Sequence, residues 1–164
     1  MQGYRAPSFS IGPENEWAFE CIERAGYRYS SSVYPIEHDH YGAPDAPRFT
    51  YDARNGLLEI PVTTMRMFGR NWPAGGGGYF RLMPYSMSRW LLRRVNMVDG
   101  QPAIFYFHPW ELDPGQPRRP SSPLLFVRHY GMLRGAAARL RALLHDHRFG
   151  SIRSIASTAL GPAA

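Results

Sequence analysis

The chain of 164 residues has no lysine, one cysteine and no long apolar run. Because all 19 basic residues are arginine, Schiff-base catalysis and the phosphate-binding lysine of a P-loop are excluded. Cys21 alone cannot form an internal disulfide or a multi-thiolate zinc site. Neither an 18-residue apolar stretch nor a signal-peptide pattern occurs. We therefore expect a soluble, cytoplasmic protein without a membrane span.

The composition that is present suits a single globular domain, with 44% hydrophobic and 20% charged residues. The formal net charge of +6 could serve an anionic partner, or could simply reflect the base composition of the genome. The arginines are dispersed and no recognised nucleic-acid-binding module is present. We therefore expect no nucleic-acid partner.

Helical and extended segments alternate along the chain, which predicts an α/β fold. Pro13 and the acidic residues after it begin a helix that Gly26 ends. Its apolar stripe is expected through Trp17, Cys21 and Ile22. Further amphipathic helices are expected after the glycine-rich stretch and near the end of the chain. The strand candidates, rich in aromatic and β-branched residues, are 27–35, 57–65 and 103–107.

Two segments between these elements are expected to be loops. Residues 35–56 contain several prolines and glycines and predict a long ordered loop. The glycine-rich residues 69–83 are interpreted either as a flexible connector or as a mobile lid over a site. Residues 113–123 carry four prolines and predict a connector to a last helix over about 129–149.

The stretch PAIFYFHPWELD, residues 102–113, places a histidine at the end of an apolar run. The run predicts a strand that is buried on both faces. His108 would lie at the carboxyl end of this strand, which is where ligands bind in α/β folds. Ile104, Tyr106 and His108 would then share one face of the strand. The alternative is a core histidine that is buried passively by the chain break at Pro109.

Short motifs of the chain resemble those of polysaccharide deacetylases, carbohydrate esterase family four. YRAPSFS resembles the Arg-x-Pro motif of this family, and FYFHPWE resembles its closing histidine motif. AGYRYSSSVYPIEHDHYGAP, FGRNWPAGGGGYFRL and HPWELDPGQPR are similar to the subgroup found beside exosortase and exopolysaccharide loci. The resemblance covers the chain up to about residue 155.

The fold that this resemblance implies is the carboxyl-terminal part of a distorted (β/α) deacetylase barrel. Residues 1–34 and 57–112 would form that half of the barrel, with the long loop 35–56 and the glycine-rich loop 69–83 inserted. Residues 113–164 would form a family-specific extension made of the connector and a helix.

The activity that the resemblance implies is removal of N-acetyl groups from an exopolysaccharide or its precursor by metal-activated water. His108 matches the family's catalytic acid, and Arg5 matches the arginine that orients the base carboxylate. Flat aromatic faces suit pyranose rings, although core packing is an equally good explanation for such residues. The expected substrate-binding residues are Phe9, Trp72, Tyr106 and Trp110.

Two departures from the family pattern concern the neighbourhood of the histidine. Ser30 stands where many members have an aspartate that tunes the catalytic histidine, and Tyr106 replaces a frequent leucine in the pocket for the acetyl methyl group. In relatives the base aspartate and the Asp-His-His metal ligands precede the Arg-x-Pro motif. We therefore expect that the zinc or similar divalent ion of the full-length family is not bound by this chain, which alone would be inactive.

Several alternatives stay open from the sequence. His38, Asp39 and His40 could form a second metal site, because residues two apart on a strand share a face. A noncatalytic carbohydrate-binding or scaffold protein of exopolysaccharide assembly is the main alternative function. The expected partner in either case is an N-acetylated polysaccharide. Unpaired strand edges of half a barrel would also favour self-association.

Overall fold

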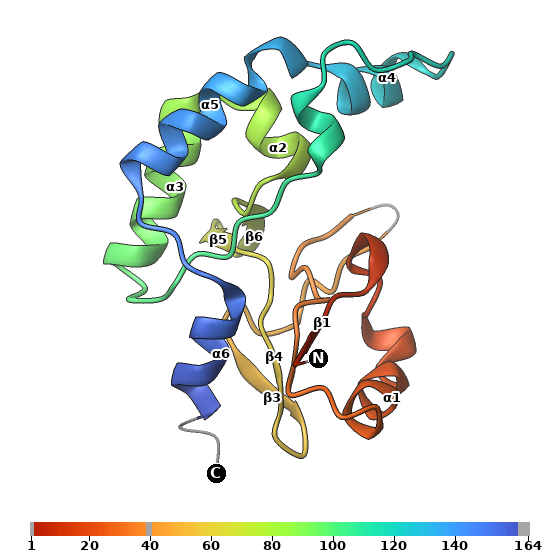
Figure 1. Cartoon of the computed structure of the whole chain (residues 1–164), viewed down its shortest axis with the longest axis vertical. Coiled ribbons are helices and arrows are strands. Elements are labelled where there is room, and N and C mark those ends of the chain that lie inside the picture. Colours follow the sequence, from red (N-terminus) through yellow and green to blue (C-terminus); the bar gives the residue numbers. More distant parts are fainter. Residues whose placement is uncertain (1, 39–40, 161–164) are drawn as a thin grey trace.

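We describe residues 2–38 and 41–160 of a computed structural model of the chain. A part built mainly of helices lies against a part built on a sheet (Figure 1). Six α-helices and two sheets in these ranges confirm the mixed α/β composition. The helices are α1 Trp17–Arg24, α2 Gly77–Leu82, α3 Tyr85–Met97, α4 Pro123–Tyr130, α5 Leu133–Asp146 and α6 Ile152–Leu160, with short 3-10 helices at Pro7–Phe9, Pro13–Asn15 and Pro109–Leu112. The strands are β1 Gly3–Tyr4, β2 Tyr29–Ser30, β3 Tyr51–Arg54, β4 Leu57–Glu59, β5 Thr64–Met67 and β6 Arg70–Pro73.

The larger sheet has the strand order β1-β2-β4-β3. Strands β1, β2 and β4 are parallel, and β3 is antiparallel to β4. Within the described residues the sheet does not close into a barrel. None of the helices described is both long and apolar enough to cross a membrane.

Strand β3 lies inside the segment 35–56 that was expected to be a loop. Asn55 and Gly56 have positive φ angles of 46° and 86° and connect β3 to β4. An Asn-Gly pair is the preferred sequence for such a tight hairpin turn. The turn therefore folds residues 51–54 back onto β4, and only the rest of the segment is irregular.

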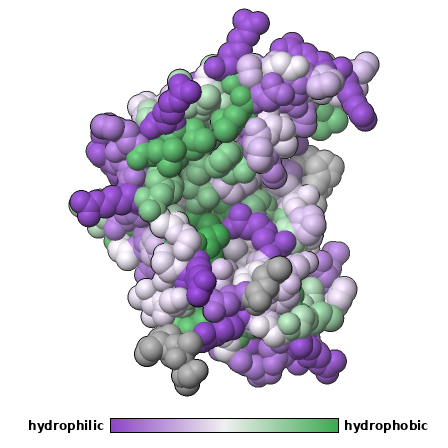
Figure 2. Space-filling view, in the orientation of Figure 1, coloured by the Kyte–Doolittle hydropathy of each residue, from purple (hydrophilic) through white to green (hydrophobic). Residues whose placement is uncertain are grey.

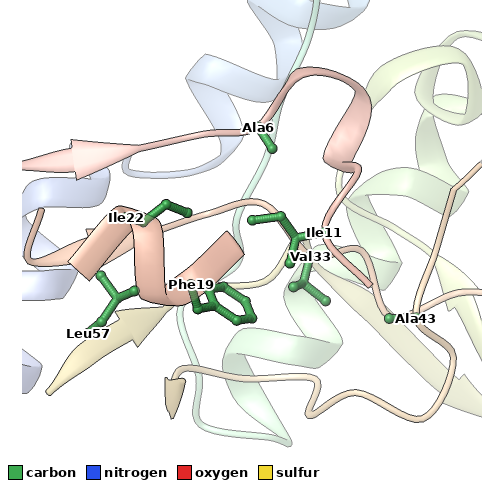
Figure 3. Packing of buried hydrophobic residues seen from close by; sticks show 7 residues of the cluster. All are labelled: Ala6, Ile11, Phe19, Ile22, Val33, Ala43 and Leu57. Carbon is green, nitrogen blue, oxygen red and sulfur yellow. The ribbon is translucent and has the colours of Figure 1, made fainter. Parts of the chain in front are cut away.

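The main core forms between α1 and the larger sheet. Phe19 and Ile22 of α1 pack with Ile11, Val33 and Leu57 (Figure 3). The predicted stripe through Trp17 and Cys21 is wrong, because Trp17 is 68% exposed and Cys21 is also exposed. The regular helix begins only at Trp17, after a 3-10 turn at Pro13–Asn15. Phe19 and Ile22, three positions apart on α1, form the face that packs on the sheet, and Trp17 lies on another face.

The predicted strand 57–65 is divided at Pro61. Residues 57–59 join the larger sheet, whereas residues 64–67 pair with β6 in a separate antiparallel hairpin. Proline lacks the N–H group that a central strand needs, which explains the break. The glycine-rich segment 69–83 is not one loop, because it contains β6 and α2.

The predicted buried strand at 103–107 is also wrong. Only one isolated bridge forms there, between Gly76 and Tyr106, and Tyr106 N donates to Gly75 O at 2.8 Å. Ile104 is buried, but Phe107 is 44% exposed. The apolar run therefore lies along the glycine-rich segment as an extended chain, without partner strands on both sides in the part of the chain described.

The described part of the carboxyl-terminal segment, residues 113–160, contains three helices rather than a connector and one helix. The expected helix over 129–149 is interrupted at Met132, whose φ of +58° ends α4 and precedes α5. Helix α5 packs on α2 and α3 through Leu143, and Figure 2 shows apolar side chains gathered over this helical part. Helix α6 returns to the sheet, where Ala156 packs with Ile60 and Ile104. The extension and the sheet therefore share one core.

Candidate functional site

A cleft of about 250 Å³ lies between the start of α2, the 106–111 segment and the end of α4, and His38 and Tyr41 also line it. It contains three of the expected catalytic and substrate-binding residues, Tyr106, His108 and Trp110. Its other lining residues are His38, Tyr41, Gly77, Gly78, Tyr79, Arg81, Leu82, Glu111 and Arg128. Imidazole, phenol, indole and guanidinium groups thus surround one concave surface.

His108 lies exposed at this cleft. Its ring is stacked with Trp110 at a centroid distance of 5.6 Å and an interplanar angle of 11°. Trp110 is stacked in turn with His129 of α4, at 4.4 Å and 15°. The interpretation of His108 as a buried core histidine is wrong, and its imidazole is accessible to a ligand.

A buried ion pair fixes the backbone that carries His108. Arg81 Nε donates to Glu111 Oε1 at 2.8 Å, and the backbone N–H of His108 donates to Glu111 Oε2 at 2.8 Å. Arg81 also donates from Nη2 to the carbonyl of Arg128 at 2.8 Å, and its guanidinium lies 5.4 Å from the Trp110 ring centroid. Arg81 therefore joins α2, the histidine segment and α4 at one point.

Phe9, Tyr34, Tyr41 and Tyr106 form an aromatic cluster beside the histidine. Phe9 lies 4.7 Å from Tyr106 and 5.7 Å from Tyr34, and the Tyr106 ring lies 5.8 Å from that of His108. Burial raises the pKa of the Tyr106 phenol above its ordinary value, and the nearby phenol of Tyr41 raises that pKa further. The Tyr106 hydroxyl is consequently protonated at neutral pH and can donate a hydrogen bond.

Arg5 lies on the other side of this aromatic cluster. Its guanidinium is 5.3 Å from the Phe9 ring centroid. It donates from Nε to Ser31 O at 2.9 Å and from Nη2 to Ser31 Oγ at 2.7 Å. The parallel pairing of β1 with β2 brings Arg5 and Ser31 together, because each follows its strand directly.

Glu59 is a fully buried carboxyl group at the end of β4. Its Oε1 accepts hydrogen bonds from the backbone N–H groups of Ser32 at 2.7 Å and Val33 at 2.9 Å. Burial raises the pKa of Glu59, while these hydrogen bonds and the positive charge of Arg5 oppose the rise. Glu59 thereby holds the segment that carries Ser31, and through it Arg5.

Trp72 is the expected site residue that lies elsewhere. It lines a neighbouring cleft of about 530 Å³ between the β5–β6 hairpin and α3, and it is 48% exposed. Tyr79 lines both clefts. The structure thus brings Arg5, Phe9, Tyr106, His108 and Trp110 together, with Trp72 in the adjoining hollow.

Three residues of this region were not singled out from the sequence, namely Glu59, Arg81 and Glu111. The stretch His-Pro-Trp-Glu carries a usable signal for one of them. A helix often starts with a proline at its first position and a glutamate whose side chain accepts a hydrogen bond from the N-cap backbone N–H. Glu111 does accept such a bond from the backbone N–H of His108. Arg81 has no comparable local signal, since its partners lie 30 to 50 residues away.

The described carboxylates do not fit the divalent metal that the resemblance implies. Glu111 is occupied by Arg81 and the His108 N–H. Glu59 is fully buried, its Oε1 accepts from two backbone N–H groups, and its Oε2 has no hydrogen-bond partner among the described residues. No cluster of three His, Cys, Asp or Glu side chains suited to a metal occurs within residues 2–38 and 41–160. His38 lines the cleft, but Asp39 and His40 of the suggested second metal site lie outside the described residues. We derive no step through a metal from these residues.

Comparison with known proteins gives a single match. None of the curated proteins compared matches the chain, and none of the solved structures does. One family model, described as a domain of unknown function, DUF3473, matches residues 31–157. This range runs from the serines beside Arg5 to α6, and it includes both clefts. The chain therefore belongs to the DUF3473 family.

Proposed function

We propose that this chain forms the acid-donating side of a polysaccharide deacetylase-type hydrolase that removes N-acetyl groups from an exopolysaccharide or its precursor. The observation that carries the proposal is the convergence of Arg5 and His108, which are far apart in the sequence, on one aromatic cluster. Phe9 and Tyr106 lie between them, with successive distances of 5.3, 4.7 and 5.8 Å. The association of the DUF3473 domain with polysaccharide deacetylases of exosortase loci also supports it.

In the proposed reaction, water attacks the carbonyl carbon of the N-acetyl group and the C–N bond breaks. His108 donates its proton to the departing amine nitrogen, and acetate is released. The exposed imidazole, held on a backbone that Glu111 fixes, suits this role. Arg5, held by Ser31, orients the carboxylate of the general base.

The remaining groups of the cleft bind the sugar in this proposal. Trp110 offers a flat face for a pyranose ring, and the protonated Tyr106 hydroxyl donates to a carbonyl or hydroxyl oxygen of the substrate. The enzyme is proposed to be metal-dependent. The water-activating zinc or similar ion, and the base carboxylate, would be held by residues other than those described here.

The test is acetate release from N-acetylglucosamine oligomers by the protein made from the longest reading frame that encodes this chain. His108→Ala should lower kcat by roughly 10²- to 10⁴-fold, the usual contribution of a positioned general acid. The melting temperature should hardly change, because the imidazole is exposed.

His145→Ala is the matched control, since that histidine is 89% exposed on α5 and lies outside the cleft. It should leave both turnover and melting temperature unchanged. Near-normal turnover of His108→Ala, or no acetate release by the unchanged protein with zinc, cobalt or nickel supplied, would contradict the proposal.

The second candidate is a noncatalytic carbohydrate-binding protein of exopolysaccharide assembly. The observation that favours it is that neither the Glu59 nor the Glu111 carboxylate is available as a base. Both oxygens of Glu111 are occupied by internal hydrogen bonds, and Glu59 is fully buried. In that case calorimetry should detect binding of the same oligomers without acetate release. Trp110→Ala should weaken binding at least about tenfold, whereas Trp17→Ala, on the exposed face of α1, should not.

A further inference from the structure

The positive charge of the chain is concentrated in one segment. Residues 114–145 contain six arginines and no aspartate or glutamate. Their charge of +6 is the same as the formal net charge of the whole chain. The other arginines and the acidic residues balance. Arg118, Arg119 and Arg134 of this segment are exposed. An anionic partner is therefore attracted to this end of the molecule rather than to its surface in general.

The amino-terminal half of helix α4, within the same segment, carries apolar side chains on all sides. Its residues Leu124, Leu125, Phe126 and Val127 are consecutive, so their side chains point in four directions about 100° apart. They are 63%, 47%, 37% and 51% exposed, and α4 has no buried residue. A helix that is hydrophobic on all sides is normally found in a protein core or in lipid.

The contacts between α4 and the rest of the helical part include two at its carboxyl-terminal end. His129 stacks on Trp110 at 4.4 Å, and the carbonyl of Arg128 accepts from Arg81. The first turn instead lies at the outer end of the helical part, away from the sheet and α6 (Figure 1). The apolar side chains of the first turn therefore face outward, while His129 and Arg128 attach the other end of α4 to the helical part.

The charge and the geometry together favour a lipid surface over a second copy of the chain. An apolar contact between two copies through α4 would bring the arginines of both copies close to one another. A protein groove would cover only one face of the helix. Lipid is fluid and can surround apolar side chains that point in four directions. Segments that bind a membrane surface combine apolar side chains, which enter the boundary between headgroups and acyl chains, with arginines that are attracted to anionic headgroups.

We propose that α4, together with Arg118 and Arg119, docks this protein on the surface of an anionic phospholipid membrane. Leu124, Leu125 and Val127 enter the boundary between headgroups and acyl chains, and the two arginines bind lipid phosphates. The stack of His129 on Trp110 then holds the cleft with His108 beside the membrane. This inference does not depend on the proposed function.

The test is cosedimentation of the full chain with vesicles of phosphatidylcholine and phosphatidylglycerol, compared with vesicles of phosphatidylcholine alone. Binding should require the anionic lipid and should weaken at high salt, because salt screens the arginines. Leu124→Ser combined with Val127→Ser should lower the partition coefficient at least about tenfold, because two exposed apolar side chains no longer enter the bilayer.

The matched control replaces two apolar residues elsewhere that are even more exposed, Phe68→Ser and Met97→Ser, at 94% and 83%. This control should bind vesicles like the unchanged protein. Equal losses in both double variants, or no binding to anionic vesicles, would overturn the proposal. Formation of a dimer through α4, or binding of DNA in place of vesicles, would overturn it as well.

Discussion

Arg81 and Glu111 form a buried ion pair with an N–O distance of 2.8 Å, and their side chains are only 2% and 3% exposed. The two residues come from α2 and from the 3-10 helix after His108. Their partners include the backbone of His108 and the carbonyls of Arg128 and Gly131. One ion pair therefore sets the position of the proposed acid and of the helix that we propose to bind membranes.

Glu111→Gln should destabilise the fold by about 3–5 kcal/mol, because it leaves the charge of Arg81 buried without its counterion. Urea denaturation followed by tryptophan fluorescence would measure this loss. Arg24→Gln is the control, since it breaks an exposed pair with Glu20 and should cost less than about 1 kcal/mol. Similar losses in the two variants would show that the buried pair is not needed for stability.

Glu59 should make the free energy of unfolding depend on pH. Burial raises its pKa above the ordinary 4.5, so between 4.5 and the raised value the folded state binds more protons than the unfolded state. The stability from this group is complete below about pH 4.5 and is lost as the pH rises through the raised pKa. Urea denaturation across this range should show that Glu59→Gln removes the decline. A parallel pH dependence of the two proteins would contradict the assignment.

Gly76→Ala should disrupt the junction between the glycine-rich segment and Tyr106. Gly76 has a φ of +116°, and an added Cβ would lie 1.9 Å from Tyr106 O. We expect a loss of more than about 3 kcal/mol, because backbone strain and a backbone clash add. Gly69→Ala is the control, with a φ of +75° and open space around the Cβ, and should cost about 1 kcal/mol. Thermal melts of both variants would compare the two positions.

Several features of the fold follow from local sequence. The Asn55–Gly56 turn joins β3 to β4, Pro61 ends β4, and Pro84 precedes α3. The α/β composition is visible for the same reason, since helical and strand patterns depend on neighbouring residues. The local sequence does not predict that Trp17, at the start of α1, is exposed. It also does not predict the break at Met132 that separates α4 from α5.

The sequence by itself determined the content of the site, namely a histidine, an arginine and aromatic residues in short motifs. Only the tertiary structure decided that Arg5, Phe9, Tyr106 and His108 lie together, that Trp72 lies in a neighbouring cleft, and that the apolar run before His108 is not a buried strand. The physical reason is that these arrangements depend on residues far apart along the chain. Arg81, whose partners lie 30 to 50 positions away, is fixed by packing that no local pattern encodes.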